Sequence, residues 1–369
     1  MKAWPVIGIF LMQVFLLLAH WFIFHTWVVF WGAGDPVVTE WLRAALLVLA
    51  FSFMSAALLS FRFHNHVVMA LYKVAAVWLG FLNFFFWASC LCWLVWFGLH
   101  LFGVQSGQRM IAIALFSMGF AAGIYGLINA RWVRLRRITV KLRGLPASWR
   151  GRTALLLSDL HLGHINGKRF IERLIDRANT LNPDVIFLPG DLFDGGKIDT
   201  DHLAMPFSRL SPRFGTYFST GIHDEFGNVT HYTAALERAG VRVLNNDRAI
   251  ADGLQIVGIS YHESNFPLRL RATLEAFKLA EGGASILLNH VPNRLPIVEQ
   301  AGVSLQLSGH THGGQIVPFT WLTRRVFGKF TYGLHSFGSL LVYTSSGAGT
   351  WGPPMRVGTH PEIVLLTFE

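Results

Sequence analysis

Long apolar runs dominate the first third of the chain. Each reaches the length of about 20 residues that a helix needs to cross the hydrocarbon core of a bilayer. Each is also nearly free of charge, and in hydrocarbon only a helix or a closed barrel satisfies its own backbone hydrogen bonds. The pattern therefore predicts four transmembrane helices. They cover residues 6–31, 41–61, 74–102 and 110–130.

From residue 138 onward the apolar runs become short and alternate with helical stretches. Strands that alternate with helices, around a hairpin-like middle at 248–259, favour a layered α/β sandwich over a helical bundle. The predicted strands are 138–142, 153–158, 185–189, 216–220, 254–259, 285–289, 304–308, 340–344 and 362–367. The predicted helices are 168–181, 230–239, 268–280 and 293–301.

The distribution of charge divides the chain. Hydrophobic residues make up 52% and charged residues only 14%, against about a quarter charged in an ordinary soluble protein, and most charges follow Arg131. We therefore predict an α/β chain with a multi-pass transmembrane region over 1–130. A basic juxtamembrane linker with the first strand would follow over 131–150, and a soluble domain over 151–369.

Basic residues near the spans predict the orientation, because they favour the cytoplasmic side. The loop 32–40 carries no Lys or Arg, whereas a cluster of arginines follows the last span. Both termini and the soluble domain are therefore predicted to be cytoplasmic. The net charge of +10 suits a membrane surface with anionic lipid, which attracts each nearby basic residue by about 1 kcal/mol. No nucleic-acid-binding module is visible, so nucleic acid is not a predicted partner.

Five short segments place metal-binding side chains directly after predicted strands. Side chains two residues apart in extended chain point the same way, so each pair in a DxH or HxH motif can converge on one centre. A carboxylate such as that of Asp191 can use its two oxygens on two ions. Mixed Asp and His ligands without thiolate favour Mn²⁺, Fe or Zn²⁺. The segments are SDLH at 158–161, GDLFD at 190–194, GIHD at 221–224, NH at 289–290 and GHTH at 309–312.

The order of these motifs resembles the calcineurin-like metallophosphoesterase superfamily, and GHTHGGQ with the C-terminal stretch is most similar to its bacterial membrane-associated branch. The resemblance implies two divalent metal ions bridged by Asp191, and a catalytic His223 oriented by Asp194. The ligands implied for the first ion are Asp159, His161, Asp191 and His312, and for the second Asp191, His290 and His310.

One position departs from the family pattern. The family has an asparagine ligand in its GNHD motif, where this chain has Ile222. An isoleucine donates nothing to a cation, so the second ion is expected to be weaker, with water or Asn289 filling the gap. The alternative is a metal-binding regulatory membrane module with little turnover.

The resemblance implies a metal-dependent phosphoesterase at a bacterial inner (plasma) membrane. Its reaction would be hydrolysis of a phosphomonoester, a phosphodiester or a pyrophosphate bond. The anchor favours lipid-linked substrates, including nucleotide-sugar lipids. The sequence leaves the substrate, the metal and the oligomeric state open.

A basic and aromatic stretch at 321–331 follows the last ligand motif. We expect a loop there. It is either a solvated loop or a segment that touches lipid headgroups beside the site.

Overall fold

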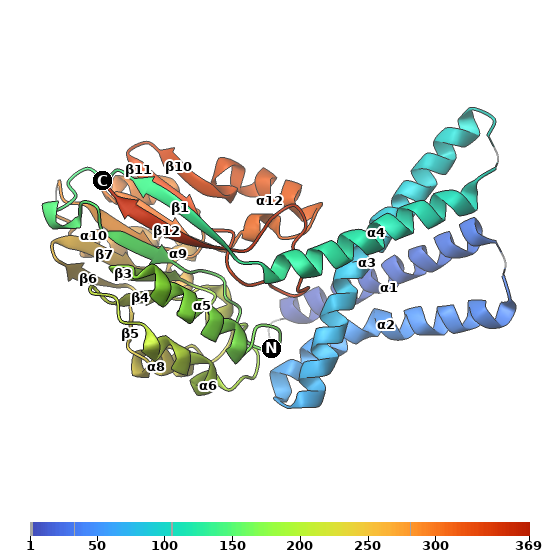
Figure 1. Cartoon of the computed structure of the whole chain (residues 1–369), viewed down its shortest axis with the longest axis horizontal. Coiled ribbons are helices and arrows are strands. Elements are labelled where there is room, and N and C mark those ends of the chain that lie inside the picture. The colour runs from blue at the N-terminus through green and yellow to red at the C-terminus, as the bar shows by residue number, and fades with distance from the viewer. Residues whose placement is uncertain (1–2, 33, 105, 281) are drawn as a thin grey trace. The chain divides into compact units, whose positions relative to one another are not determined.

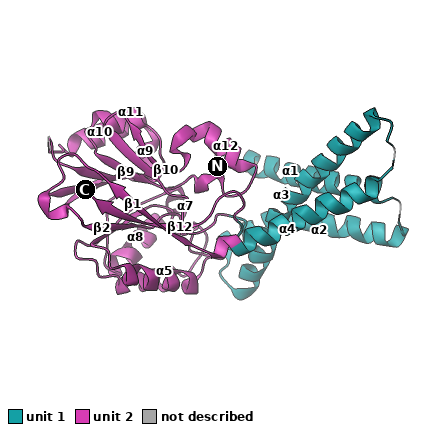
Figure 2. Ribbon diagram, turned by 45° about the horizontal axis from the view of Figure 1, so that its top comes forward, with its two compact units in different colours: residues 1–128, 352–355 teal, residues 129–351, 356–369 magenta. Residues whose placement is uncertain are grey.

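The computed structural model describes residues 3–32, 34–104, 106–280 and 282–369 (Figure 1). Its internal contacts divide the chain into two compact units, which Figure 2 colours separately. One unit comprises Met1–Ile128 with Gly352–Met355, and the other Asn129–Trp351 with Arg356–Glu369.

The first unit is built from four helices, each long and apolar enough to cross a membrane, as the apolar runs predicted. Small and aliphatic side chains such as Leu16, Ala19 and Leu82 pack between them. Many large apolar side chains face outward, which is typical of helices that contact lipid. The chain is thus a membrane protein. The helices are α1 (Ala3–Trp31), α2 (Pro36–Arg62), α3 (His66–Leu101) and α4 (Gln108–Arg131).

The second unit contains two six-stranded sheets. The order in the first sheet is β1-β12-β2-β3-β4-β5, and in the second β10-β11-β9-β8-β7-β6. The strands of the first sheet are β1 (Arg134–Val140), β2 (Thr153–Leu156), β3 (Val185–Pro189), β4 (Thr216–Ser219), β5 (Val241–Val243) and β12 (Glu362–Phe368). Those of the second are β6 (Asp247–Ala251), β7 (Leu254–Gly258), β8 (Ser285–Leu288), β9 (Leu305–Ser308), β10 (Gly333–Phe337) and β11 (Leu340–Thr344).

Parallel strands form the centre of each sheet. Strands β2 to β5 run parallel in one sheet, and β7, β8, β9 and β11 in the other. Parallel pairing needs crossover connections, and most of these contain a helix. The helices are α5 (Lys168–Leu181), α6 (Thr200–Ala204), α7 (Ile222–Phe226), α8 (Val229–Arg238), α9 (Tyr261–Asn265), α10 (Pro267–Ala276), α11 (Leu295–Gln300) and α12 (Phe319–Phe327).

Three apolar cores hold the layers together. The central core joins the facing sides of the two sheets through residues such as Phe187 and Leu307. A second core packs α5 and α8 on the outer face of the first sheet, and a third packs α10 and α11 on the second. This is the predicted layered α/β sandwich, and the predicted hairpin is β6 paired with β7.

The structure also corrects several predictions of elements. Strand β1 begins at Arg134 rather than at 138, because it pairs in parallel with β12 along its whole length. The stretch predicted as a loop at 321–331 begins inside α12, which is a regular helix. Strands β5 and β10 were not predicted, because each lies at a sheet edge and lacks a long apolar run.

Candidate metal centre

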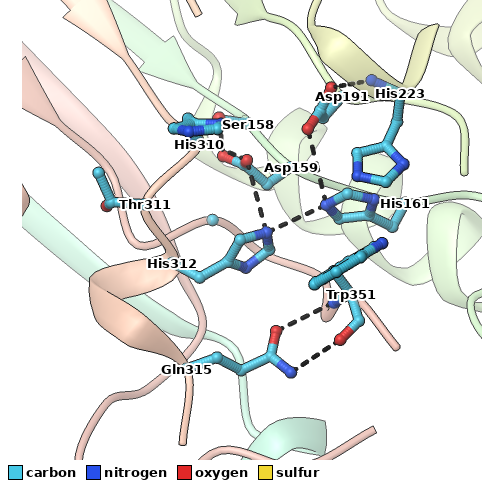
Figure 3. Close-up of polar contacts among 12 residues, drawn as sticks. Ser158, Asp159, His161, Asp191, His223, His310, Thr311, His312, Gln315 and Trp351 are labelled. Atoms are coloured by element: carbon cyan, nitrogen blue, oxygen red, sulfur yellow. Dashed lines mark hydrogen bonds and ion pairs between the residues drawn. The ribbon is translucent and has the colours of Figure 1, made fainter. Parts of the chain in front are cut away.

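The five predicted ligand segments lie at the carboxyl ends of five parallel strands. Strands β2, β3 and β4 supply three of them from one sheet, and β8 and β9 supply two from the other. Open parallel sheets place ligand sites at such ends. The backbone N–H of His310 donates to Oδ1 of Asp159 at 2.8 Å, so segments of both sheets meet here. Figure 3 shows this convergence.

Most of the predicted ligands have an unusual backbone conformation. Their φ angles are positive, which is uncommon for residues other than glycine and marks constrained functional sites. Each such conformation costs on the order of 1–3 kcal/mol, and the surrounding packing must hold it. The fold thus holds the ligands in sharp turns at the strand ends. The residues are Asp159 (52°), His161 (46°), Asp191 (53°), His310 (68°) and His312 (49°).

Gly190 shows why the GD motif requires its glycine. Its φ is +85°, and a Cβ there would lie 2.7 Å from Nδ1 of His290 and 2.6 Å from the backbone N of Gly221. Any side chain would push apart the segments that follow β3, β4 and β8. The glycine therefore permits the close approach that brings Asp191 and His290 together.

Asp159, His161 and His312 form the tighter cluster. Nε2 of His161 lies 3.0 Å from Nε2 of His312, which lies 3.6 Å from Oδ1 of Asp159. All three side chains are buried. Two imidazole nitrogens at this distance share either a proton or a cation, and the neighbouring carboxylate stabilises the positive charge of either one. These residues suit the ligation of a first ion (Figure 3).

Asp191 lies between the two clusters. Its Oδ2 is 3.0 Å from Nε2 of His290 and 3.9 Å from Nε2 of His161, whereas its Oδ1 accepts a hydrogen bond of 2.8 Å from the backbone N–H of His223. That each oxygen would serve one ion stays a prediction, since an oxygen that accepts one hydrogen bond keeps a second lone pair. Oδ2 alone faces histidines of both clusters, because Oδ1 is engaged by the α7 backbone.

The second cluster is less complete than the sequence predicted. Asp159, Asp191 and His290 offer ligand atoms within 4.8 Å of one another. Over the described parts of the chain, no such three-residue group includes His310. The His310 ring is nevertheless the neighbour of His290, with the ring centroids 5.2 Å apart. The structure thus brings two of the three predicted ligands together and leaves His310 beside them.

His223 and Asp194 lie on the other side of His161. Oδ1 of Asp194 is 3.4 Å from Nδ1 of His161, and these two residues group with His223 within 4.8 Å. The His161 and His223 rings are 4.9 Å apart. Asp194 was predicted to orient His223. The structure places Asp194 near both histidines, and its ion pair is with His161.

A fully buried arginine, Arg356, supports the tighter cluster. Its guanidinium donates to the carbonyl oxygens of His312 (2.9 Å), Ser346 (2.7 Å) and Gly349 (2.6 Å). Nη2 also lies 3.0 Å from Nδ1 of His312, so it holds the ring edge opposite Nε2. Burial lowers the pKa of Arg356 to about 10. Sequence reasoning missed this residue, since a single arginine in a glycine-rich loop carries no signal.

Asp224 ties two ligand segments together and was also missed. It accepts hydrogen bonds from the backbone N–H groups of Asp191 (2.7 Å), Phe193 (3.0 Å) and Gly221 (2.8 Å). Burial, with the charge of Asp191, raises the pKa of Asp224 to about 7. The position of Asp224 at the end of the GIHD motif was the sequence feature that could have indicated this role.

The electrostatics of the histidines fit cation binding. Burial and the charge of His290 lower the pKa of His310 to about 4, and burial and the charge of Arg356 hold the pKa of His312 well below its usual value. Burial alone would lower the pKa of His290, but Asp191 outweighs it and raises the pKa to about 10. His290 donates its Nδ1 proton to the carbonyl of Pro189 at 3.0 Å, which turns Nε2 toward Asp191. An ion would replace the proton between them.

Ile222 begins α7, at the position where the family pattern has its asparagine. Asn289, the suggested substitute, is fully buried, and neither polar atom of its side chain has a hydrogen-bond partner. Buried polar groups are nearly always hydrogen-bonded, so these two atoms leave the Asn289 amide available to a cation. Asn289 as the replacement ligand stays a prediction.

The sandwich fold and its buried Asp and His cluster define a metallohydrolase domain. A family model for the calcineurin-like phosphoesterases matches residues 153–314. The metallophosphoesterase YkuE of Bacillus subtilis is 31% identical over 266 residues, which cover 68% of this chain and 91% of that protein. This chain therefore belongs to the calcineurin-like metallophosphoesterases, a family of metal-dependent phosphohydrolases.

Other relatives share only part of their length with this chain. A transmembrane protein with metallophosphoesterase domain from Danio rerio is 32% identical over 283 residues, which cover 72% of this chain and 64% of that protein. Among solved structures, a dimetal phosphatase from Danio rerio matches 54% of this chain and 88% of that chain, with a TM-score of 0.32 and 9% identity. The activity and substrate of the whole chain are therefore matters for proposal.

Proposed function

We propose that this protein is a membrane-anchored phosphoesterase that uses two divalent ions, Mn²⁺, Fe or Zn²⁺, to hydrolyse a phosphate ester or pyrophosphate. The observation that carries the proposal is the position of Asp191, whose Oδ2 approaches His161 and His290 at once. Two bound ions would lower the pKa of a water and neutralise charge on the phosphoryl group. The first would be held by Asp159, His161, Asp191 and His312, and the second by Asp191, His290 and His310.

His223 is the group best placed to act on the leaving oxygen. Its ring lies 4.9 Å from that of His161 and 5.6 Å from that of Trp351, so it sits at the rim of the cluster (Figure 3). Burial and the charge of His161 lower its pKa. The lowered pKa favours the neutral ring, which can donate an N–H hydrogen bond to the departing oxygen. Asp194 lies close enough to position both rings.

The indole of Trp351 forms one side of this rim. The backbone N–H of Trp351 donates to Oε1 of Gln315 at 3.0 Å, and Nε2 of Gln315 donates to the backbone carbonyl of Trp351 at 2.9 Å. Gln315 belongs to the GHTHGGQ stretch, so this pair of hydrogen bonds fixes Trp351 relative to the ligand loop. The exposed ring is available to contact the organic part of a substrate.

We place the substrate at the cytoplasmic face of a bacterial inner membrane and favour lipid-linked phosphate esters. The support is the short tether: α4 ends at Arg131 and β1 begins at Arg134, and two residues span at most about 7 Å. The arginines around this tether favour the cytoplasmic side. A C-terminal green fluorescent protein fusion should fluoresce and an alkaline phosphatase fusion should be inactive. The opposite result would reverse the orientation.

The activity is tested with the purified full chain in detergent. We expect Mn²⁺-dependent release of p-nitrophenol from p-nitrophenyl phosphate or bis-p-nitrophenyl phosphate, and its loss in Asp191→Ala. Asp201→Ala is the matched control, because Asp201 is an exposed carboxylate paired with Arg238. Metal binding without turnover of either ester would instead support the regulatory module.

A further inference from the structure

Helix α12 presents an apolar face to solvent. Phe319, Leu322 and Val326 are spaced three and four residues apart, so they share one side of the helix. Their exposed fractions are 53%, 60% and 66%, and the neighbouring Trp321 is 71% exposed. A contiguous apolar face of this kind marks an interaction surface.

The adjacent side of α12 packs next to the metal centre. Thr320 is buried, and the ring of Phe327 lies 5.8 Å from that of His310. The hydroxyl of Thr331 donates to the carbonyl of Thr323 at 3.2 Å, and that of Thr311 donates to the carbonyl of Thr331 at 2.7 Å. The apolar face is therefore fixed to the same loop that carries His310 and His312.

A pocket of about 540 Å³ lies between this helix and α11. Val326 and Phe327 line it from α12, Leu295 lines it from α11, and His310 lines it from the ligand loop. Arg294, whose φ is +54°, adds a positive charge to its wall. If the organic part of a phosphoester lay in this pocket, its phosphate group would lie beside His310.

The charged residues of α12 and of the turn after it are all basic. Arg324, Arg325 and Lys329 are exposed, and the sequence contains no Asp or Glu between Glu299 and Glu362. An amphipathic helix with aromatic and aliphatic residues on one face and basic residues beside it is typical of helices that lie in a membrane interface. Anionic lipid headgroups complement this charge.

We propose that α12 is an interfacial helix that inserts its Phe319, Leu322 and Val326 face into an anionic bilayer and opens the adjoining pocket to an amphiphilic phosphoester. The occupant of the face is lipid, because the described residues include four helices able to span a membrane and only two residues separate the last of these helices from β1. The substrate class rests on the proposed phosphoesterase activity, whereas the insertion of α12 does not.

The occupant is identified by cross-linking in nanodiscs of phosphatidylglycerol and phosphatidylcholine. The full chain would carry p-benzoylphenylalanine at position 322 or, as a matched control, at position 250, since Ile250 is 66% exposed on β6. A phospholipid adduct at 322 and none at 250 is expected. A cross-link from 322 to a spanning helix, to a second copy or to another protein overturns the proposal, as does the absence of any lipid adduct.

The substrate class is tested with two diesters that share one leaving group, hexadecyl p-nitrophenyl phosphate and methyl p-nitrophenyl phosphate. Leu322→Glu should lower kcat/KM for the hexadecyl ester about tenfold and leave the methyl ester unchanged, since a charge opposes insertion. Ile250→Glu should change neither. Equal losses on both esters, or no loss, overturn the proposed substrate route. If the wild type hydrolyses neither of these diesters nor p-nitrophenyl phosphate, the phosphoesterase function fails, and the lipid adduct still decides the insertion of α12.

Discussion

The two halves of the metal centre use the same kinds of side chain but are supported differently. His312 lies within hydrogen-bonding distance of His161 and ion-pair distance of Asp159, and Arg356 contacts the opposite edge of the His312 ring. The second half has the pair of Asp191 and His290, with His310 beside it.

The two halves also differ in the burial of their predicted ligands and in the number of donors. In the first half every ligand is buried, whereas His310 in the second is only half-buried. Ile222 also stands where the family pattern has an oxygen donor. We therefore expect a tight first ion and a weaker second ion, and the following predictions test that contrast.

The largest effect is expected from Asp191→Ala. This change removes the carboxylate that approaches both clusters, so both ions should weaken. A loss of roughly 10³-fold in kcat/KM is expected, because the ions supply several kcal/mol of transition-state stabilisation. Metal content by mass spectrometry of the purified protein should fall for both ions. Retention of one ion at full affinity would show that Asp191 serves a single site.

The second prediction separates the halves directly. His312→Ala should remove the tighter of two Mn²⁺-binding events, and His310→Ala should remove only the weaker one. Activity should fall by about 10²-fold in each case, but only His310→Ala should leave high-affinity binding intact. Calorimetric titration of both variants decides this. If both variants lose the same event, the division into halves is wrong.

Arg356 provides a third test, because it acts on the first half only. Arg356→Met should weaken the first ion by roughly 10–100-fold, the usual effect of losing an outer partner of a metal ligand. Arg356→Lys should restore the binding only in part, since a lysine cannot reproduce the planar fork. Saturating Mn²⁺ should recover much of kcat if the role is positioning. Arg238→Met, an exposed pair with Asp201, is the control and should not change metal affinity.

The smallest effect, and a gain, is expected from Ile222→Asn. Restoring an oxygen donor at the start of α7 should tighten the second Mn²⁺-binding event about tenfold and raise turnover at limiting metal. The first event should not change. Coincident titration curves for the wild type and the variant would mean that the second half does not lack this ligand.

Much of the architecture follows from local patterns. Four long apolar runs predicted the four helices α1 to α4, because spanning a bilayer is a constraint on one continuous segment. Strands β3 and β11 were predicted with their observed bounds, and β2, β4, β7, β8 and β9 within a few residues. The predicted ligand residues could also be found from local patterns, because each segment that contains them directly follows an apolar strand.

Only the tertiary structure decided how these residues are used. The pairing of Asp194 with His161, the single Asp191 oxygen that faces both clusters, and the support from Arg356 each depend on segments far apart in the sequence. Helix α12 was not predicted from the sequence, because its apolar residues face outward and do not form part of a core. The sequence by itself determined which side chains are available, and the packing of two sheets determined which of them meet.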